Sequence, residues 1–355
     1  MSGQSEVKSD TENQSASKLQ RVKTPLGFDL LLDPGDYFSR LFMRDGVFEA
    51  PESDLISRLV HPDDTCIDAG SHVGYYTCLL ARLVGTKGQV YAFDANPEAC
   101  EAAKRNLSLN GLTSAEVIHT ALSDHEGSSP FYVSSDDQTG LSSVGSIPIF
   151  KKILQVPCSR LETFLENRGV EHIRLLKIDV EGSEEVVLSG LGSFLTAHLT
   201  DFILVELYDE RLRGMNTCTE KLKGIFQKAG YQAWTYESAS GWHMASQVES
   251  RGDCNYLFVS PTVHESVPPF SLAPVLAETQ VTLSRERETL RAREQETQGL
   301  RREVEALRPE TQRTQEETVR LQERLLAIEN SVAWRVLNAY RKFRRYFGFG
   351  KNSAP

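Results

Sequence analysis

Residues 66–75 read CIDAGSHVGY, a short apolar run that reaches Asp68 and then turns through Gly70 and Gly74. This pattern is typical of a strand that leads into a helix. Glycine lets the backbone approach a ligand closely, and the first turn of a helix offers N–H groups without intrahelical partners. A dinucleotide-binding GxGxxG turn would need its middle glycine at His72, so the sequence disfavours NAD and FAD. A purely structural turn stays open as the alternative.

A second acid follows the next apolar run. Residues 90–97 read VYAFDANP, and Asp94 lies about 20 residues after the glycine turn, where nucleotide-binding α/β folds hold a ribose-binding carboxylate. A carboxylate suits this position because it accepts hydrogen bonds from both ribose hydroxyls. The alternative is that Asp94 caps the helix that begins near Pro97, a role that Asn96 can fill alone.

Apolar runs alternate with helical segments from residue 64 onward. The runs are TCIDAG, QVYAFDA, AEVIHTAL, IRLLKIDV and DFILVEL. Such alternation predicts βαβ units, and therefore an α/β fold whose largely parallel sheet carries helices on both faces. Two later runs, YQAWTY and CNYLFVS, predict a hairpin at the sheet edge, with Trp242 and His243 in its connecting loop. Residues 128–160 predict an inserted hairpin near the mouth of the site, where loops often carry specificity.

A third junction of strand and acid, KIDVEG at residues 177–182, completes a pattern that resembles the FkbM-type methyltransferase family. The family's other hallmarks are a DxGxxxG turn, an acid-x-Asn-Pro segment and an ALSD-like turn, which match residues 68–74, 94–97 and 121–124. The resemblance spans about residues 40–260. Asp94 departs from it, because glutamate is commoner there; the shorter carboxylate keeps the chemistry but changes the ribose geometry.

The resemblance implies a class I methyltransferase fold, which is Rossmann-like. Its seven-stranded, mainly parallel sheet has the order 3-2-1-4-5-7-6, with strand 7 antiparallel. Ligands bind where such a strand order reverses, here between strands 1 and 4. The implied cofactor is S-adenosylmethionine. The residues expected to bind it are Asp68, Gly70 and Ser71 for the methionine moiety, Asp94 and Ala95 for the ribose and adenine edge, Ser123 and Asp124 for the adenine amino side, together with Gly74 and Asn96.

The expected reaction is methyl transfer to a hydroxyl, because the resembled family consists chiefly of O-methyltransferases. A hydroxyl is a poor nucleophile until it loses its proton, so a base within about 2.6 to 3.2 Å would help. Asp179 is the first candidate for this base and Glu181 the second. His243 is a candidate because the ordinary pKa of histidine suits a general base, and Glu206 is one because it lies at the end of a predicted strand. No metal is assigned, although clustered carboxylates would suit magnesium or calcium.

We therefore expect an enzyme that methylates a hydroxyl on a sugar of a glycan or glycolipid. Two alternatives stay open: an O-methyltransferase of a lipid, polyketide or small-molecule acceptor, and a non-catalytic scaffold that acts through its C-terminal tail. The acceptor classes share the same cofactor machinery, so the sequence does not separate them. Intact Asp68, Gly70, Gly74, Asp94 and Asp179 favour catalysis over the scaffold.

Composition and charge disfavour other classes of protein. The net charge of −10 over 355 residues argues against a general nucleic-acid binder, because phosphate binding needs clustered Lys and Arg. The six cysteines show no CxxC pair or zinc spacing and are expected to be free thiols. No apolar run approaches the roughly 18 to 20 residues that cross a bilayer, and the polar N-terminus is unlike a signal sequence, so we expect a cytoplasmic protein.

The chain is expected to divide into five segments. In order, they are a disordered N-terminus at residues 1–20, the methyltransferase domain at 21–262, a Pro-rich linker at 263–275, a coiled coil at 276–330 and a basic amphipathic tail at 331–355.

The expected coiled coil rests on a seven-residue repeat of apolar side chains that runs from Leu276 to Leu325. A single helix cannot bury such a seam, so the repeat predicts a homo-oligomer. Threonine at several seam positions weakens the pattern, and Pro309 should kink or break the helix. A solvated single helix is the alternative.

The tail at 331–355 carries six basic side chains and no acid, so it is +6 and, since the whole chain is −10, the rest is −16. Trp334, Leu337, Tyr340 and Phe343 recur every three residues among these basic side chains, which predicts a short amphipathic helix for an anionic membrane surface. An acidic protein partner is the equal alternative. The S-x-x-W-R segment resembles the end of coiled coils in bacterial surface-polysaccharide enzymes, which implies polysaccharide biosynthesis at the inner face of a membrane.

Overall fold

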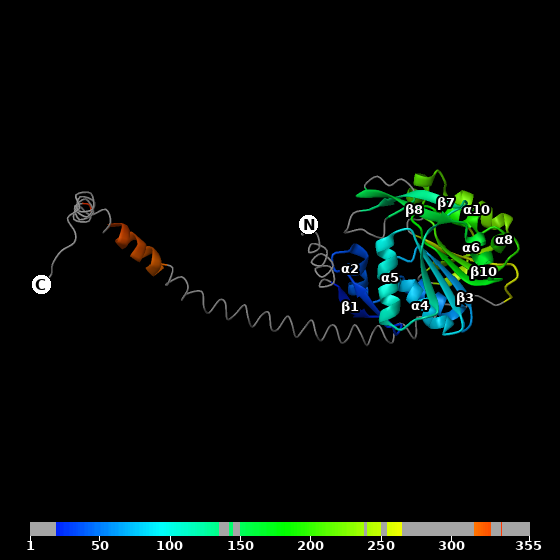
Figure 1. Ribbon diagram of the computed structural model, residues 1–355, viewed down its shortest axis with the longest axis horizontal. Coiled ribbons are helices and arrows are strands. Elements are labelled where there is room, and N and C mark those ends of the chain that lie inside the picture. The colour runs from blue at the N-terminus through cyan, green and yellow to red at the C-terminus, as the bar shows by residue number, and fades with distance from the viewer. Residues whose placement is uncertain are drawn as a thin grey trace, which may run out of the picture. The chain divides into compact units, whose positions relative to one another are not determined.

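The structure is a computed structural model that describes residues 19–134, 142–144, 150–237, 240–249, 254–264, 316–327 and 335 (Figure 1). The chain divides into two compact units, Met1–Val275 and Leu276–Pro355. Several expectations lie wholly or mostly outside the described residues: the disordered N-terminus, the Pro-rich linker, most of the coiled coil and all of the basic tail except Arg335. Those expectations stay predictions.

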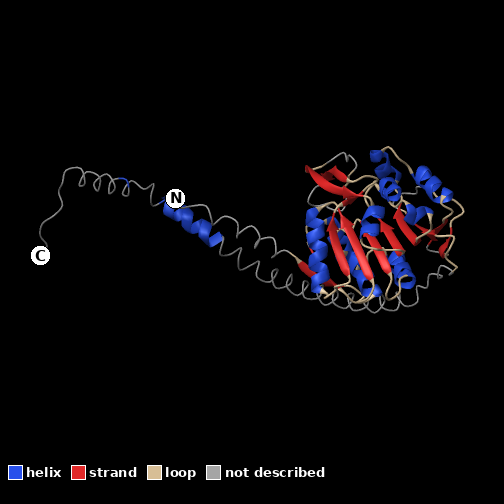
Figure 2. Ribbon diagram, turned by 45° about the vertical axis from the view of Figure 1, so that its right-hand side comes forward, coloured by secondary structure: helices blue, strands red, loops and turns tan. Residues whose placement is uncertain are grey.

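Among the described residues, an eight-stranded sheet forms the centre of the first unit, in the order β12-β11-β13-β10-β9-β3-β4-β5 (Figure 2). Its strands are β3 (Thr65–Ala69), β4 (Gln89–Asp94), β5 (Ala115–His119), β9 (Ile173–Ile178), β10 (Thr200–Glu206), β11 (Gln232–Glu237), β12 (Gly241–Met244) and β13 (Asn255–Val259). The first five of these are parallel, and β13 runs antiparallel to β10. Apart from β12, this is the strand order that the family resemblance implied, so that expectation is confirmed.

The expectation of seven strands is wrong, because β12 adds an eighth to the described sheet. The sequence placed Trp242 and His243 in a loop, but both lie on β12, which pairs antiparallel with β11. The two runs expected to form the hairpin do pair, since β11 is also antiparallel to β13. Trp242 is buried, and its Nε1 donates to Pro51 O at 3.2 Å. This anchored indole stabilises a strand that is too short to show a pattern in the sequence.

Helices cover both faces of the sheet, as expected, because neighbouring side chains on a strand point to opposite sides. On β9, Leu175 packs into one core and Leu176 into the other. The first core takes side chains from α3 (Ala50–Leu59), α4 (Tyr75–Val84) and α5 (Pro97–Leu109). The second takes them from α6 (Leu161–Asn167), α7 (Glu184–Gly190), α8 (Ser193–Thr196) and α10 (Thr219–Lys228).

A segment that the sequence patterns did not reveal precedes the central sheet. It comprises β1 (Gln20–Lys23) and β2 (Asp29–Leu32), which pair antiparallel, and α2 (Tyr37–Asp45), which leads into α3. Two asparagines of α5 fix the hairpin: Asn106 Oδ1 accepts from Leu31 N, and Asn110 Nδ2 donates to Asp29 O, each at 2.7 Å. The segment is therefore an integral part of the first unit.

The inserted hairpin expected over residues 128–160 is present. It belongs to a small sheet of β6 (Ala121–Leu122), β7 (Gly127–Val133) and β8 (Lys152–Ser159), in which β7 and β8 are antiparallel. Phe131 and Val133 pack with Ala95 and Ala121, so the hairpin lies against the ends of β4 and β5. On the other side of the sheet's carboxyl edge, α9 (Asp209–Leu212) and the short helix η2 (Arg213–Met215) follow β10.

In the second unit, residues 316–327 are helical and their side chains are exposed. Leu325 belongs to the expected seven-residue repeat, and Leu321 falls three residues after Thr318 of that repeat, at its second apolar position. They are 59% and 60% exposed. The oligomeric coiled coil itself stays a prediction. Throughout the described residues, no helix has both the length and the apolar character that crossing a membrane requires.

Candidate active site

The turns after β3 and β9 meet at the carboxyl edge of the sheet. Asp179 N donates to Ala69 O at 2.9 Å, and Gly70 N and Ser71 N donate to Phe93 O at 2.9 and 3.0 Å. Gly70 has a φ of 90°, and a Cβ at this position would lie 1.7 Å from Asp179 O, so only glycine fits. The glycine turn and Asp179 therefore share one crevice, as the strand order predicted.

A pocket opens at this junction. Its walls come from the turns after β3, β4, β5 and β9, from the inserted hairpin and from the segment before α3. The site residues predicted from the sequence that line it are Gly70, Ser71, Asp94, Ala95, Asn96, Asp179 and Glu181. Whether these residues contact a cofactor remains a prediction, but the fold brings them to one place.

Asp94 joins two of the turns that form the pocket. Its Oδ2 accepts from His72 N at 2.8 Å, and its Oδ1 accepts from Asn96 N at 2.7 Å. Asn96 caps α5, since its side chain accepts from Glu98 N at 3.0 Å. Burial raises the pKa of Asp94 even though these N–H groups oppose it. The cap of α5 is thus Asn96, while Asp94 links the two turns and lines the pocket.

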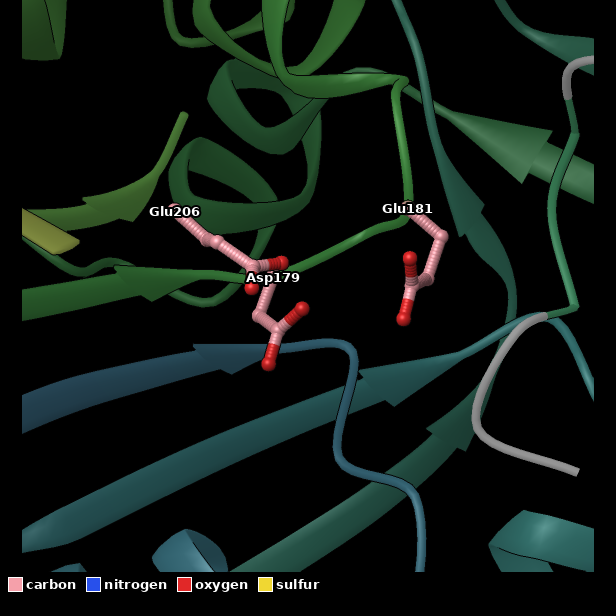
Figure 3. Close-up of side chains that lie close together, drawn as sticks. All are labelled: Asp179, Glu181 and Glu206. Atoms are coloured by element: carbon pink, nitrogen blue, oxygen red, sulfur yellow. The ribbon is translucent and has the colours of Figure 1, made fainter. Parts of the chain in front are cut away.

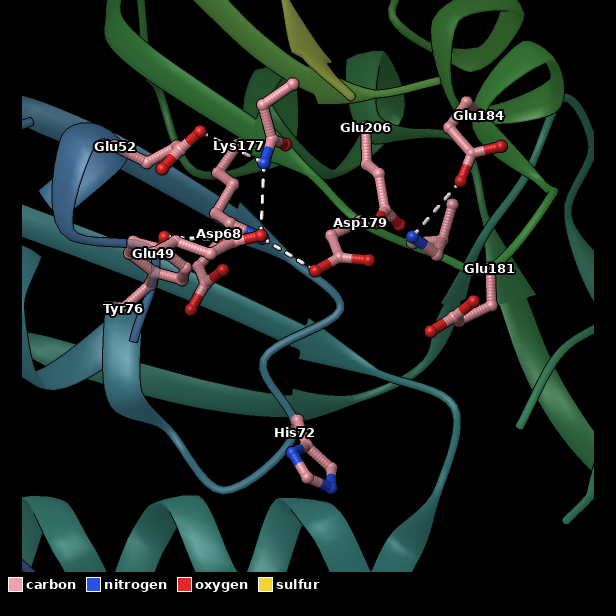
Figure 4. Close-up of polar contacts among 12 residues, drawn as sticks. Glu49, Glu52, Asp68, His72, Tyr76, Lys177, Asp179, Glu181, Glu184 and Glu206 are labelled. Carbon is pink, nitrogen blue, oxygen red and sulfur yellow. Dashed lines mark hydrogen bonds and ion pairs between the residues drawn. The ribbon is translucent and has the colours of Figure 1, made fainter. Parts of the chain in front are cut away.

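Lys177 lies beneath the pocket with its ammonium group almost fully buried (Figure 4). Its Nζ donates to Asp179 Oδ2 at 2.9 Å and lies 4.5 Å from the centroid of the Tyr76 ring. Burial alone would lower the pKa of this ammonium, but the carboxylates of Asp179, Glu49 and Asp68 outweigh burial and raise it. Lys177 is therefore a fixed positive charge under the site.

That charge sets the protonation state of Asp179. Burial alone would raise the pKa of Asp179, but the Lys177 ammonium outweighs it and holds the pKa below its ordinary value. Asp179 is consequently a carboxylate at neutral pH. Because one oxygen is bound by Lys177 and the side chain lines the pocket, this carboxylate can accept a hydrogen bond from a ligand.

Two further acids lie beside Asp179 (Figure 3). Carboxylate oxygens of Asp179, Glu181 and Glu206 lie within 4.8 Å of one another, a spacing that could hold a cation. Arg211 pairs with Glu181, and its NH1 lies 3.4 Å from Glu206 Oε2. Burial, with the charge of Asp179, raises the pKa of Glu206 well above its ordinary value. Within this cluster a proton is therefore held more readily by Glu206 than by Asp179.

Asp68 and Gly74 support the pocket from behind. Asp68 is fully buried, and its Oδ2 accepts from Thr77 Oγ1 at 2.6 Å. Burial raises the pKa of Asp68 to about 6, against the opposing effect of Lys177. At Gly74, where φ is 83°, a Cβ would lie 2.9 Å from Ala103 Cα, so this glycine lets α4 pack closely on α5. Neither residue lines the pocket.

Ser123 and Asp124 directly follow Leu122, which lines the pocket, but do not line it themselves. Ser123 N donates to Ser159 O at 2.9 Å, and Asp124 is half exposed and pairs with His125 at 2.8 Å. The preceding residues, Thr120, Ala121 and Leu122, line the pocket instead. The ALSD turn therefore adjoins the pocket, and the residues that line the pocket there are the ones just before Ser123.

His243 lies far from the other candidate bases. Its strand, β12, is four strands from β9 in the sheet, which corresponds to about 19 Å at ordinary strand spacing. Its Nδ1 lies 3.2 Å from Ser240 Oγ and 3.0 Å from Gly241 O, and it does not line the pocket. The position of His243 gives no support to its predicted role as general base.

Several pocket residues were not identified from the sequence. Lys177 lies within the quoted KIDVEG motif and could have been found there, because a lysine inside a buried strand needs a nearby acid. Tyr76 lines the pocket too, and it directly follows the quoted glycine turn. Phe38 and Phe48 also line the pocket, and no motif marks them. Glu49 does not line the pocket, but it is half-buried behind it, and its Oε2 accepts from Tyr76 Oη at 2.6 Å. These residues show that the site extends beyond the strand-end motifs.

Comparisons with known proteins agree with this geometry. The family described as the Methyltransferase FkbM domain matches residues 68–233. Residues 68–233 form an FkbM methyltransferase domain. The chain is an S-adenosylmethionine-dependent methyltransferase, as its motifs predicted.

Two curated relatives are similar over this methyltransferase domain. Methyltransferase 1 of Beauveria bassiana is 29% identical over 171 residues, which are 42% of this chain and 67% of that protein. The 2-O-methyltransferase NoeI of Sinorhizobium fredii is 29% identical over 174 residues, which are 44% of this chain and 69% of that protein. The crystal structure of Methyltransferase FkbM from Methylobacillus flagellatus is 13% identical with a TM-score of 0.36, over 55% of this chain and 43% of that one. A TM-score this low carries no argument about the fold, so the fold assignment rests on the observed strand order.

The pocket of this methyltransferase fits S-adenosylmethionine chemically. Ser71 and Ser183 line it with buried hydroxyls, and within the described chain neither Oγ has a hydrogen-bond partner. Such hydroxyls are free to bind a polar ligand. The carboxylates of Asp94, Asp179 and Glu181 suit the cofactor's positive sulfonium and ammonium groups. Gly70, which also lines the pocket, lets the turns after β3 and β9 cross closely.

Proposed function

We propose that this methyltransferase acts on a hydroxyl of a sugar in a glycan or glycolipid. The observation that carries the proposal is the Asp179 carboxylate, which is ionised beside Lys177 and lines the same pocket as the cofactor turns. A carboxylate in that position accepts a hydrogen bond from an alcohol and then takes its proton. The name of the NoeI relative, a 2-O-methyltransferase, supports an oxygen acceptor.

In the proposed reaction, S-adenosylmethionine supplies a methyl group that the acceptor oxygen attacks in line, so that the C–O bond forms as the C–S bond breaks and the electron pair returns to sulfur. Asp179 orients the acceptor hydroxyl and receives its proton. The low pKa of Asp179 makes it a weak base, so the proton moves late, as the oxygen becomes positively charged. Lys177 keeps Asp179 ionised and in place.

Glu206 and Arg211 have supporting roles in this proposal. Protonated Glu206 donates a hydrogen bond to the neighbouring acid, which keeps two adjacent carboxylates from repelling each other. Arg211 neutralises Glu181 at the edge of the same cluster. The charge at Asp179 is then available for the acceptor.

The proposal is tested by incubating the full-length protein with methyl-labelled S-adenosylmethionine and panels of methyl glycosides, amines and thiols. We expect label on a glycoside oxygen, located by mass spectrometry and NMR. Transfer only to nitrogen or sulfur, or no transfer to any glycoside, would overturn the sugar assignment.

We also propose that residues 276–330 join copies of the chain and that the basic tail at 331–355 contacts an anionic membrane surface. The seven-residue repeat and the exposed Leu321 and Leu325 of the described helix support the first part. The six basic side chains of the tail support the second.

A further inference from the structure

One wall of the pocket has the chemistry that suits the adenine of the cofactor. Ala95, Leu122, Phe131 and Val144 form an apolar wall beyond Asp94, where the adenine of the cofactor would follow its ribose. Ala95 and Phe131 belong to one small core against which Val144 packs, so the inserted hairpin builds this wall. The hairpin therefore lines the part of the pocket assigned to the adenine, and its expected role in specificity stays a prediction.

A second wall of the pocket is aromatic, and its Phe38 ring packs edge-on against His72 of the glycine turn, with centroids 5.0 Å apart. Phe38 and Phe48 line it, with ring centroids 4.7 Å apart, and Phe48 lies 6.2 Å from the Tyr76 ring. Tyr76 in turn contacts Lys177, which holds Asp179. A continuous surface therefore runs from two half-buried phenylalanines to the proposed catalytic carboxylate.

The connection between α2 and α3, which carries Phe48, is fixed at several points. Glu49 accepts from Tyr76 Oη at 2.6 Å and from Asn255 Nδ2 at 3.0 Å (Figure 4). Its φ of 44° lies in the left-handed region, which a non-glycine residue adopts when its surroundings determine its position. Ser53 Oγ also donates to Phe48 O at 2.9 Å. Phe48 is therefore held in place before any ligand binds.

We propose that Phe38 and Phe48 form the wall of an acceptor subsite that takes the apolar face of a sugar ring, while a hydroxyl at the ring's edge faces Asp179. This inference rests on the proposed function. A pyranose ring presents C–H groups on its faces and hydroxyls at its edge, so an aromatic wall next to a carboxylate matches both. Acceptor selection then depends on the segment around residues 37–49, which lies outside the matched family domain at 68–233.

The test uses the full-length protein, labelled S-adenosylmethionine and the methyl glycoside that the natural protein methylates best. Phe38→Ala should raise the KM for the glycoside by about 10-fold or more, and leave the KM for the cofactor within about two-fold. Val144→Ala should raise the KM for the cofactor and leave the KM for the glycoside within about two-fold, because Val144 belongs to the wall assigned to the adenine. Phe150→Ala is the matched control and should change neither constant, since Phe150 is 44% exposed and does not line the pocket.

An unchanged KM for the glycoside in Phe38→Ala would overturn the subsite while leaving the proposed function intact. Failure of the natural protein to methylate any glycoside would overturn both. If Phe38→Ala does not fold, Phe38→Leu replaces it, because leucine keeps the apolar volume and removes the ring. Its glycoside KM should still rise, and an unchanged value there would equally contradict the proposal.

Discussion

The Asp94 carboxylate accepts hydrogen bonds from the backbone of two turns, and a bound ribose would be its third partner. Replacing it with alanine removes the acceptor for both ribose hydroxyls and also releases His72 N and Asn96 N. We expect Asp94→Ala to weaken cofactor binding by about 1 to 3 kcal/mol, measured by isothermal titration. Glu98→Ala, an exposed acid four residues away, is the control and should bind normally. Unchanged affinity in a folded Asp94→Ala variant would mean that Asp94 only holds the turns.

Asp179 carries the chemistry in this account. Asp179→Asn keeps the size of the side chain but removes its charge and basicity, so turnover should fall by about 10² to 10⁴-fold while cofactor affinity changes little. Glu206→Gln is the comparison, and it should lose less activity because an amide still donates a hydrogen bond in place of the protonated acid. Near-normal turnover in Asp179→Asn would move the role of base to Glu181.

At the residue scale, the sequence located the pocket through acids and glycines at strand ends. This works because the carboxyl ends of neighbouring parallel strands meet at one edge, so Gly70, Asp94 and Asp179 had to lie near one another. It could not locate Phe38, because an aromatic residue on a short helix carries no pattern of its own. It misplaced His243, because its distance from the site depends on how many strands intervene.

At the scale of elements, the turn between β9 and α7 depends on a buried acid. Glu184 Oε1 accepts from Gly182 N at 3.1 Å and Val180 N at 3.3 Å, while its Oε2 is buried without a hydrogen-bond partner in the described chain. Burial raises the pKa of Glu184 to about 7 from 4.5. The folded state therefore favours the protonated acid, and the stability it contributes is present below about pH 4.5 and lost as the pH rises through 7.

Glu184→Gln should remove this pH dependence, because the amide keeps the acceptor oxygen and does not ionise. Relative to the natural protein, the free energy of unfolding of the variant should increase by up to about 3 kcal/mol between pH 4 and pH 8. Urea unfolding at a series of pH values measures this difference. A difference that stays constant with pH would show that Glu184 does not titrate in this range.

The strands also show which elements sequence patterns can predict and which they cannot. β3, β4 and β9 are apolar runs buried on both faces, and such runs are easily recognised. β12 has four residues and forms because β11 offers its edge and Trp242 finds a buried position. Those conditions depend on tertiary structure, so the sequence predicted the short run GWHM as part of a loop.

At the scale of the whole molecule, the matched domain is smaller than the unit that folds. The family match covers residues 68–233, whereas the compact unit spans Met1–Val275. Glu49 and Asn255 lie outside the match but bind each other near Lys177. A fragment restricted to the matched residues would therefore lack part of the site.

The tail gives a separate prediction for the whole chain. Truncation after Thr262 should yield a monomer that binds S-adenosylmethionine but no longer sediments with anionic vesicles, because joined copies of a +6 tail strengthen membrane attachment by avidity. Analytical ultracentrifugation and vesicle sedimentation at low salt measure the two effects. A monomeric full-length protein, or one that ignores the vesicles, would favour a protein partner for the tail.

The most direct test of the central claim is a crystal structure of the full-length protein with S-adenosylhomocysteine. We expect the adenine against Ala95, Leu122 and Phe131, the ribose at Asp94, and the sulfur facing Asp179 across the glycine turn. Binding outside this pocket, or a sulfur atom turned away from Asp179, would contradict the account.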